Sequence, residues 1–262
     1  MDNKNKKRIV IKVGTSSLTY DTGKLNIKTI EKLVRIISDL LNRGLEVVLV
    51  SSGAIGAGVG KLNLLEKPDD TVKKQALAAI GQASLVSIYD RFFSEYGHTT
   101  AQVLLTKFIL DDEARYNNTK NTFSAMFEYG VVPIVNENDV ISTYEIEFGD
   151  NDTLSAYIAR LVEADLLIIL SDVDGFYSCN PAENPEAKFI PVVEEITDEI
   201  FSHAQGAGSR RGTGGMQTKL LAAKYVGETG IDMIIANGAR LENLYDIIDG
   251  KSVGTLFKAK KK

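Results

Sequence analysis

Apolar runs alternate with amphipathic stretches along this chain. Short, almost continuously apolar runs are typical of parallel strands that are covered on both faces. They lie at Ile9–Val13, Val47–Val50, Ala101–Leu105, Val131–Val135, Leu166–Leu170 and Met233–Ala236. Helical periodicity is present at Ile27–Asn42, Val72–Ile80, Ser84–Tyr96, Tyr116–Tyr129, Asp152–Val162, Gln217–Glu228 and Leu241–Ile248. The alternation predicts an α/β fold, a three-layer α/β/α sandwich with a mainly parallel central sheet.

No linker or fixed-period repeat divides the 262 residues. We therefore expect a single domain over residues 1–258, with a solvated basic tail at 259–262. Two segments break the alternation of strands and helices. Residues 139–149 indicate a small hairpin or lid, and residues 174–215 are irregular and end in the Gly-rich stretch Gln205–Gly215.

Composition narrows the class of protein. The net charge of −5 provides no positive field for nucleic acid or an anionic membrane. The N-terminus does not resemble a signal peptide, and the longest aliphatic run, Leu166–Leu170, is too short to span a bilayer. With one cysteine and two distant histidines, neither a disulfide nor a thiolate or histidine metal site is expected. We expect a cytoplasmic protein without a resident metal.

Carboxylates and carboxamides gather in two segments that flank predicted strands. These are Asn136-Glu137-Asn138-Asp139 and Gly149-Asp150-Asn151-Asp152. Turn preference explains any one of these residues, but not their concentration. Such groups offer hydrogen bonds rather than packing, so the cluster indicates a pocket for a small zwitterion beside a nucleotide.

Glycine-rich segments follow several predicted strands, where open parallel sheets bind ligands. Neither common phosphate motif fits, because GxxxxGK[ST] is absent and Gly56–Gly60 misses GxGxxG by one position. Lys12 lies near the end of an apolar strand, where an unpaired ammonium group is costly and a negatively charged ligand would offset that cost. The alternative interpretation is a lysine that snorkels from the strand edge to water. Lys219 is predicted in the first turn of a helix, where a cation opposes the helix dipole. Two such lysines suggest a clamp on a transferring phosphoryl group.

Several motifs occur together and in order along almost the whole chain. They are Ile11–Ser16, Ser51–Ile55, Val135–Asp139, Gly149–Asp152 and the GTGGM-x-TK segment Gly212–Lys219. In this combination the chain strongly resembles the glutamate 5-kinases of the amino acid kinase superfamily. Many members carry a C-terminal PUA domain, and the sequence stops before one could begin.

The resemblance implies that ATP phosphorylates the γ-carboxylate of glutamate, the first step of proline biosynthesis. By position, the residues implied to bind glutamate are Ser52, Gly53, Asn136, Asp139, Asn151 and Asp152. Those implied to bind ATP are Lys12, Gly14, Ser171, Asp172, Thr213, Gly214, Gly215, Met216, Gln217, Thr218 and Lys219. Catalytic roles fall to Lys12, Lys219 and Asp150, with Asp150 and Asp152 either orienting the lysines or receiving the substrate ammonium.

This chemistry is consistent with the residues. A γ-carboxylate with a pKa near ~4.3 is ionised at neutral pH and needs no general base. Repulsion between it and the triphosphate must be cancelled by the lysines, backbone N–H groups and Mg²⁺. Mg²⁺ keeps waters and uses substrate phosphates, so no protein ligand is assigned to it.

Other members of the superfamily are the alternatives, namely acetylglutamate, aspartate, UMP, carbamate and isopentenyl phosphate kinases. A non-catalytic sensor of glutamate or nucleotide is a further alternative, which the presence of both lysines disfavours. The resemblance also implies a homo-oligomer (dimer or tetramer), functional coupling to glutamyl phosphate reductase, and feedback inhibition by proline through the segment Ala57–Lys67.

Overall fold

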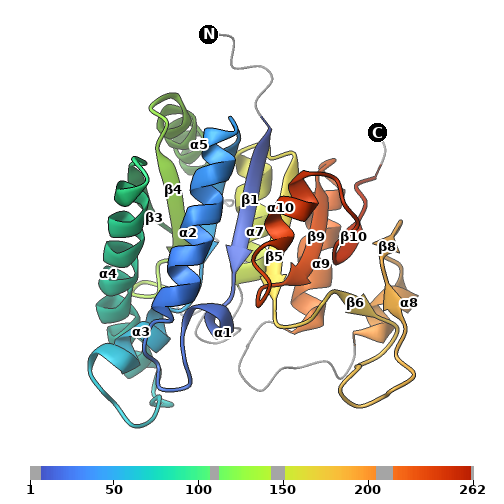
Figure 1. Ribbon diagram of the computed structural model, residues 1–262, viewed down its shortest axis with the longest axis horizontal. Coiled ribbons are helices and arrows are strands. Elements are labelled where there is room, and N and C mark those ends of the chain that lie inside the picture. The colour runs from blue at the N-terminus through green and yellow to red at the C-terminus, as the bar shows by residue number, and fades with distance from the viewer. Residues whose placement is uncertain (1–6, 107–111, 143–150, 205–214, 261–262) are drawn as a thin grey trace.

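The computed structural model describes residues 7–106, 112–142, 151–204 and 215–260. Its centre is an eight-stranded sheet in the order β3-β4-β2-β1-β5-β9-β10-β8 (Figure 1). All neighbouring strands pair in parallel except β9 and β10. The prediction of a mainly parallel sheet is therefore confirmed.

The described strands follow the expected order. They are β1 (Arg8–Val13), β2 (Glu46–Ser51), β3 (Thr100–Leu105), β4 (Val132–Glu137), β5 (Leu166–Ser171), β6 (Phe176–Tyr177), β7 (Phe189–Ile190), β8 (Val192–Val193), β9 (Asp232–Asn237) and β10 (Thr255–Phe257). The helices are α1 (Thr15–Leu18), α2 (Ile27–Asn42), α3 (Ala54–Lys61), α4 (Thr71–Glu95), α5 (Glu113–Glu128), α7 (Asn151–Leu161), α8 (Asp198–His203), α9 (Met216–Gly227) and α10 (Asn243–Ile248). None of these helices is both long and apolar enough to cross a bilayer.

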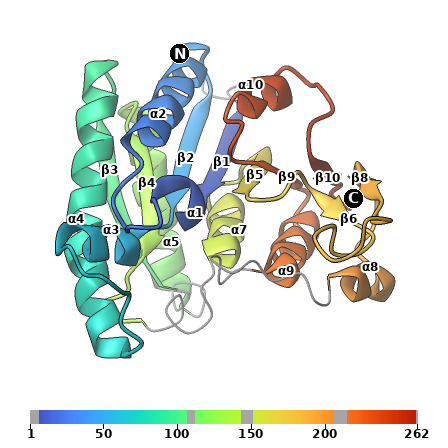
Figure 2. The ribbon, with the colours of Figure 1, turned by 60° about the horizontal axis from the view of Figure 1, so that its bottom comes forward.

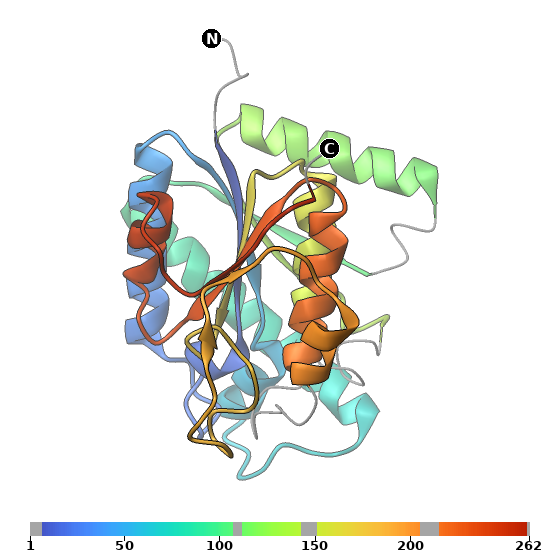
Figure 3. The same cartoon turned by 90° about the vertical axis from the view of Figure 1, so that its right-hand side faces the viewer.

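Helices cover both faces of the sheet, as the view of the sheet edge-on shows (Figure 3). Ile9 and Ile11 of β1 belong to the core beneath α2, α4 and α10. Val10, between them, belongs to the core beneath α5, α7 and α9. Successive side chains on a strand point to opposite faces, so a continuously apolar strand contributes to both cores. This accounts for the unbroken apolar runs in the sequence.

Helix α4 is one continuous helix, and the prediction of two helices at 72–80 and 84–96 is wrong. The apparent break contains Gly81, which is buried within the helix. A Cβ added at Gly81 would lie 1.8 Å from the carbonyl oxygen of Ala54 in α3. A Cβ added at Gly58 would lie 2.1 Å from the carbonyl oxygen of Leu77 in α4. These glycines therefore allow α3 and α4 to touch (Figure 2).

Several short elements escaped prediction because they carry little periodicity. The Gly-rich stretch after β2 forms helix α3, and β6, β7, β8, α8 and β10 arise in irregular sequence. Two contacts hold the last described residues against the fold. Lys258 pairs with Glu194 at 2.6 Å, and the Lys260 amide donates to the carbonyl oxygen of Gly227. Most of the expected hairpin at 139–149 and of the Gly-rich stretch at 205–215 lies outside the described residues.

Candidate active site

Four strand ends that carry polar or glycine-rich sequence meet at one edge of the sheet. Strands β4, β2, β1 and β5 are adjacent and parallel. Their carboxyl ends carry Asn136, Ser52, Gly14 and Ser171. The sheet order therefore brings the segments expected to share a site to neighbouring positions, at the edge where parallel sheets bind ligands.

Lys12 of β1 and Lys219 of α9 contact the same carboxylate. The Nζ atom of Lys12 lies 2.6 Å from Oδ1 of Asp152, and the Nζ atom of Lys219 lies 2.9 Å from Oδ2. The three residues are buried, with exposed fractions of 7%, 6% and 0%. The two ammonium groups, from opposite ends of the chain, are thus held on either side of one aspartate.

The two lysines change the electrostatics of Asp152. Burial by itself would raise the pKa of the Asp152 carboxyl, but Lys12 and Lys219 outweigh burial and hold that pKa below its ordinary value. Asp152 also lies in the first turn of α7, where the helix dipole favours a carboxylate. Two ammonium groups held on one carboxylate are the kind of arrangement that can stabilise a phosphoryl group in transfer.

A network of buried amides lies on the β4 and β2 side of the lysines. The Nδ2 atom of Asn151 donates to Oδ1 of Asn136 at 2.8 Å and to Oγ of Ser52 at 2.9 Å. The Nδ2 atom of Asn136 donates in turn to Oε1 of Gln82 on α4, at 2.9 Å. Gln82 was not foreseen from the sequence, although a glutamine between buried positions of a helix is a recognisable signal.

Gly53 lies between Ser52 and the first residue of α3. Its φ angle of 101° lies in the left-handed region, which residues other than glycine rarely adopt. The backbone can therefore turn sharply from β2 into α3 and place Ser52 beside the amide network. Here the glycine serves chain geometry at the site, whereas Gly58 and Gly81 serve helix packing.

Two further carboxyl groups, those of Glu137 and Asp139, lie at the end of β4, close in sequence to Asn136. Both are buried, with exposed fractions of 5%. Burial and, to a smaller extent, the neighbouring Glu137 raise the pKa of the Asp139 carboxyl to about 7, against an opposing effect of Lys67. Asp139 therefore changes charge within the physiological pH range.

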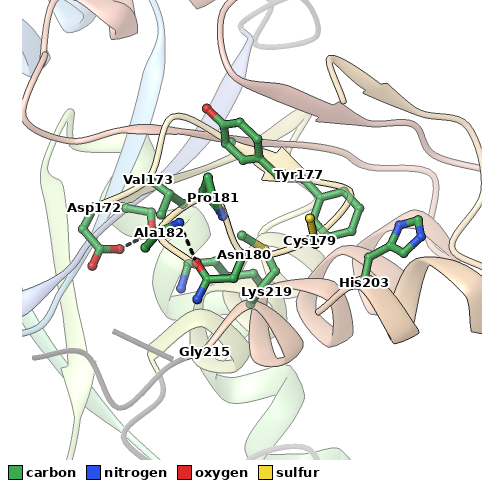
Figure 4. A pocket seen from close by; sticks show the side chains of 14 residues that line it. Asp172, Val173, Tyr177, Cys179, Asn180, Pro181, Ala182, His203, Gly215 and Lys219 are labelled. Carbon is green, nitrogen blue, oxygen red and sulfur yellow. Dashed lines mark hydrogen bonds between the residues drawn. The ribbon is translucent and has the colours of Figure 1, made fainter. Parts of the chain in front are cut away.

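A cavity of about 230 Å³ lies on the β5 side of the lysines (Figure 4). Its walls are mostly apolar and include Phe176, Tyr177, Pro181 and Met216. Asp172 and His203 lie at opposite sides of it, and Lys219 links it to the Asp152 cluster. An apolar cavity with a few polar groups is typical of a small-molecule site, and here it would suit a nucleobase.

The residues expected to bind ATP are only partly gathered at this cavity. Ser171, Asp172, Gly215, Met216 and Lys219 line it. In contrast, Gln217 is exposed on the first turn of α9. The hydroxyl of Thr218 lies 3.2 Å from Oδ2 of Asp152 and 2.7 Å from the carbonyl oxygen of Gly215, within hydrogen-bonding distance of both. Asp150, Thr213 and Gly214 lie outside the described residues.

Gly14 lies beside the lysine cluster rather than in the cavity wall. A Cβ added there would come 3.9 Å from Nζ of Lys12. The cavity residues that the sequence did not indicate, Tyr177, Cys179, Asn180 and His203 among them, belong to the irregular segment after β5 and to α8. No periodicity marks them, so only the folded chain brings them to the site.

Comparisons with known proteins agree with this geometry. The model of the Amino acid kinase family matches residues 7–237. Glutamate 5-kinase of Clostridium perfringens (strain 13 / Type A) is 58% identical over 98% of this chain and 97% of its own length. The chain belongs to the glutamate 5-kinase family. Glutamate 5-kinase of Thermoanaerobacter sp. (strain X514) is also 58% identical, over 97% of this chain and 68% of its own length.

Two solved structures share the fold at much lower identity. A UMP kinase from Bacillus anthracis superimposes with a TM-score of 0.65 at 17% identity, covering 97% of both chains. A T. acidophilum isopentenyl phosphate kinase product complex gives a TM-score of 0.61 at 17% identity, covering 96% of this chain and all of the other. They establish the fold, whereas the family assignment comes from the glutamate 5-kinase relatives.

Proposed function

We propose that this protein transfers the γ-phosphoryl group of ATP to the γ-carboxylate of L-glutamate, giving L-glutamyl 5-phosphate and ADP in the first step of proline biosynthesis. The observation that carries the proposal is the pair of buried lysines on Asp152, between an amide network and an apolar cavity. The glutamate 5-kinase relatives, 50–58% identical, support the same reaction.

In this mechanism the residues bind and neutralise, and no side chain needs to remove a proton. An ionised γ-carboxylate oxygen attacks the γ-phosphorus as the bond to the ADP oxygen breaks. Lys12 and Lys219 offset the negative charge on the transferring group, and Asp152 holds the two ammonium groups in place. The α-carboxylate of glutamate is assigned to Ser52, Gly53, Asn136 and Asn151. Its ammonium group is assigned to Asp139.

Mg²⁺ is proposed to accompany ATP and to supply charge neutralisation on the phosphates. Among the described residues, no three His, Cys, Asp or Glu side chains gather into a metal-binding group. Beside nucleotides Mg²⁺ usually binds through phosphate oxygens and water, a manner of binding that needs few protein ligands. Asp172 lines the cavity, and its carboxylate would be available to hold such an ion.

The assignment predicts a product that hydroxylamine traps as a hydroxamate. With ATP and Mg²⁺, we expect hydroxamate from L-glutamate and none from N-acetylglutamate or aspartate, because acylation removes the ammonium and a shorter chain misplaces the acceptor carboxylate. The assay measures coloured hydroxamate and released ADP in parallel. Diphosphate formation from UMP, or binding of glutamate and ATP without turnover, would contradict the proposal and support another kinase or a sensor.

Asp139 predicts a pH dependence for glutamate recognition. Its carboxylate must be ionised to attract the substrate ammonium, and burial with Glu137 nearby raises its pKa to about 7. Between pH 8 and pH 6 the ionised fraction falls about tenfold, so KM for glutamate should rise about tenfold while KM for ATP stays constant. In Asp139→Asn the KM for glutamate should be high and independent of pH.

Thermal unfolding provides an independent check on Asp139. Because its pKa is higher in the folded protein than in the unfolded chain, the folded state binds more protons between about pH 4 and pH 7. The contribution of Asp139 to stability therefore decreases as pH rises through this window. Asp139→Asn should gain Tm relative to the unmodified protein over the same range, and parallel Tm curves would contradict the shifted pKa.

Assembly and regulation are proposed from the family and from exposed apolar groups. Leu62, Leu65 and Val72 around the α3–α4 connection are exposed, as are Val140 and Ile141 beyond β4. Such a group of apolar side chains suits a subunit contact in a dimer or tetramer. From the family we also propose feedback inhibition by proline and functional coupling to glutamyl phosphate reductase. The segment expected to mediate proline inhibition was Ala57–Lys67. Its residues 57–61 belong to helix α3, so only the exposed residues 62–67 form a loop.

A further inference from the structure

We propose that Gln82 is a positioning residue for the substrate pocket, acting through the carboxamide of Asn136. The inference rests on the proposed function of the amide network as the glutamate site. Gln82 belongs to a polar stripe on α4 formed by Gln75, Gln82 and Tyr89, which we call the α4 stripe. Each of its members forms a hydrogen bond with a different residue outside α4.

The α4 stripe follows from helical geometry. Its successive members are seven positions apart, so they lie on one face of the helix and each is about 10.5 Å from the next along its axis. The Nε2 atom of Gln75 donates to the carbonyl oxygens of Asp139 and Val140, at 3.0 and 3.2 Å. At the other end, the hydroxyls of Tyr89 and Ser51 share a buried hydrogen bond of 3.0 Å.

Gln82 occupies the middle of the stripe and determines how Asn136 is turned. Its Oε1 atom accepts a hydrogen bond of 2.9 Å from Nδ2 of Asn136. The other end of that carboxamide, Oδ1, is thereby directed at Nδ2 of Asn151, 2.8 Å away. Rotating the carboxamide by half a turn would bring two acceptors together at Gln82 and two donors together at Asn151. The hydrogen bond to Gln82 therefore selects one orientation.

The orientation is passed on to the residue at the end of β2. With its amide group directed at Asn136, Asn151 also donates to Oγ of Ser52 at 2.9 Å. A chain of buried hydrogen bonds thus runs from α4 through β4 and α7 to the turn that begins α3. Because the groups are buried, a donor left without its acceptor is costly, and the whole chain favours a single arrangement.

The backbone beside Gln82 is fixed to the same turn. The neighbouring Gly81 contacts α3 so closely that an added Cβ would lie 2.4 Å from the amide nitrogen of Gly58. Helix α3 itself begins at Ala54, directly after Gly53 and Ser52. Both the side chain of Gln82 and the helix that carries it are therefore fixed relative to the turn at Ser52 and Gly53. The position of Asn136 thus depends on that of Ser52.

Two substitutions separate the hydrogen bond from simple packing. Gln82→Met keeps the length of the side chain but loses the strong acceptor, whereas Gln82→Glu keeps an acceptor oxygen. With Gln82→Met we expect KM for glutamate to rise about tenfold, with kcat and KM for ATP within about threefold of the unmodified protein. Gln82→Glu should restore KM toward its original value. Gln102→Met, the same change at an exposed position of β3, serves as the matched control.

A double-mutant cycle with Asn136→Ala decides whether Gln82 acts through Asn136. If it does, Gln82→Met should raise KM for glutamate about tenfold in the original background and hardly at all in Asn136→Ala. Additive effects, or an unchanged KM in Gln82→Met, would overturn the inference. Should Gln82→Met fail to fold, Gln82→Ala takes its place in the cycle, since truncation leaves room for water.

The experiment distinguishes this inference from the proposed function. If the unmodified protein makes no hydroxamate from glutamate, the proposed reaction fails, and the role of Gln82 in it fails too. If the unmodified protein makes hydroxamate and Gln82→Met has the same KM for glutamate, the reaction stands and the positioning role is rejected. Near-ultraviolet circular dichroism of each variant confirms that the compared proteins are folded.

Discussion

Replacing Lys12 with alanine is expected to lower kcat by about three orders of magnitude, the effect of losing a charged group that stabilises the transition state. The ammonium of Lys12 lies 2.6 Å from Asp152 and, in the proposed mechanism, faces the transferring phosphoryl group. That mechanism assigns glutamate to the amide network and the nucleotide to the cavity, so both KM values should change less than about fivefold. Steady-state kinetics with hydroxamate detection measure all three constants.

Two further variants identify the charge as the cause. Lys12→Met retains most of the length of the buried side chain and should lose as much turnover as Lys12→Ala. Lys28→Ala removes an exposed lysine from α2 and should leave kcat unchanged. A Lys12→Ala variant with kcat within tenfold of the unmodified protein would remove Lys12 from the mechanism and leave it a structural partner of Asp152.

Replacing Asp152 with asparagine is expected to lower both activity and stability. The substitution preserves shape but leaves the buried ammonium groups of Lys12 and Lys219 without their shared carboxylate. Breaking a buried ion pair in this way costs about 3–5 kcal/mol in the free energy of unfolding. We expect Tm to fall by roughly 6–15 °C for a chain of this size, as measured by calorimetry.

The pH dependence of that loss has a definite sign. The lysines lower the pKa of Asp152 in the folded protein, so its contribution to stability is fully present above the pKa of an unfolded aspartate, about 3.9, and is lost as pH falls below it. The Tm difference between the two proteins should be constant at neutral pH and narrow in acid. Equal Tm values at pH 7 would mean that the cluster does not depend on this carboxylate.

An exposed ion pair supplies the control for Asp152. Glu163 pairs with Lys120 at 2.5 Å, and its side chain is 69% exposed. Water screens such pairs, so Glu163→Gln should change the free energy of unfolding by less than about 1 kcal/mol. A similar loss of stability in both variants would show that burial is not what makes the Asp152 cluster important.

The predictability of the fold differed from element to element. Helix α2 was predicted with its observed bounds, because its apolar positions recur at helical spacing, Asn26 caps its start and Gly44 follows its end with a φ of 90°. Helix α4 was divided in two, because Gly81 looks like an interruption when its contact with α3 is unknown. Propensity is local, and a long-range contact can override it.

The candidate site divides along similar lines. Lys12 and Asn136 stood out because polar or charged residues rarely follow or interrupt buried apolar segments. Lys219 stood out because a cation in the first turn of a helix opposes the helix dipole. Gln82 and the cavity residue Tyr177 did not, since one lies within a helix and the other in an irregular segment. Residue type indicated where chemistry would occur, but not which side chains support it.

By itself, the sequence determined the alternation of strands and helices, the parallel sheet, and the kinds of group that stand at the strand ends. Only the tertiary structure decided that Lys12 and Lys219 share Asp152, that Gln82 turns Asn136, and that an apolar cavity adjoins Lys219. The physical reason is that periodicity reports which face of an element is buried. Which residues meet across those faces depends on strand order and helix packing, and these bring together groups that are far apart in the chain.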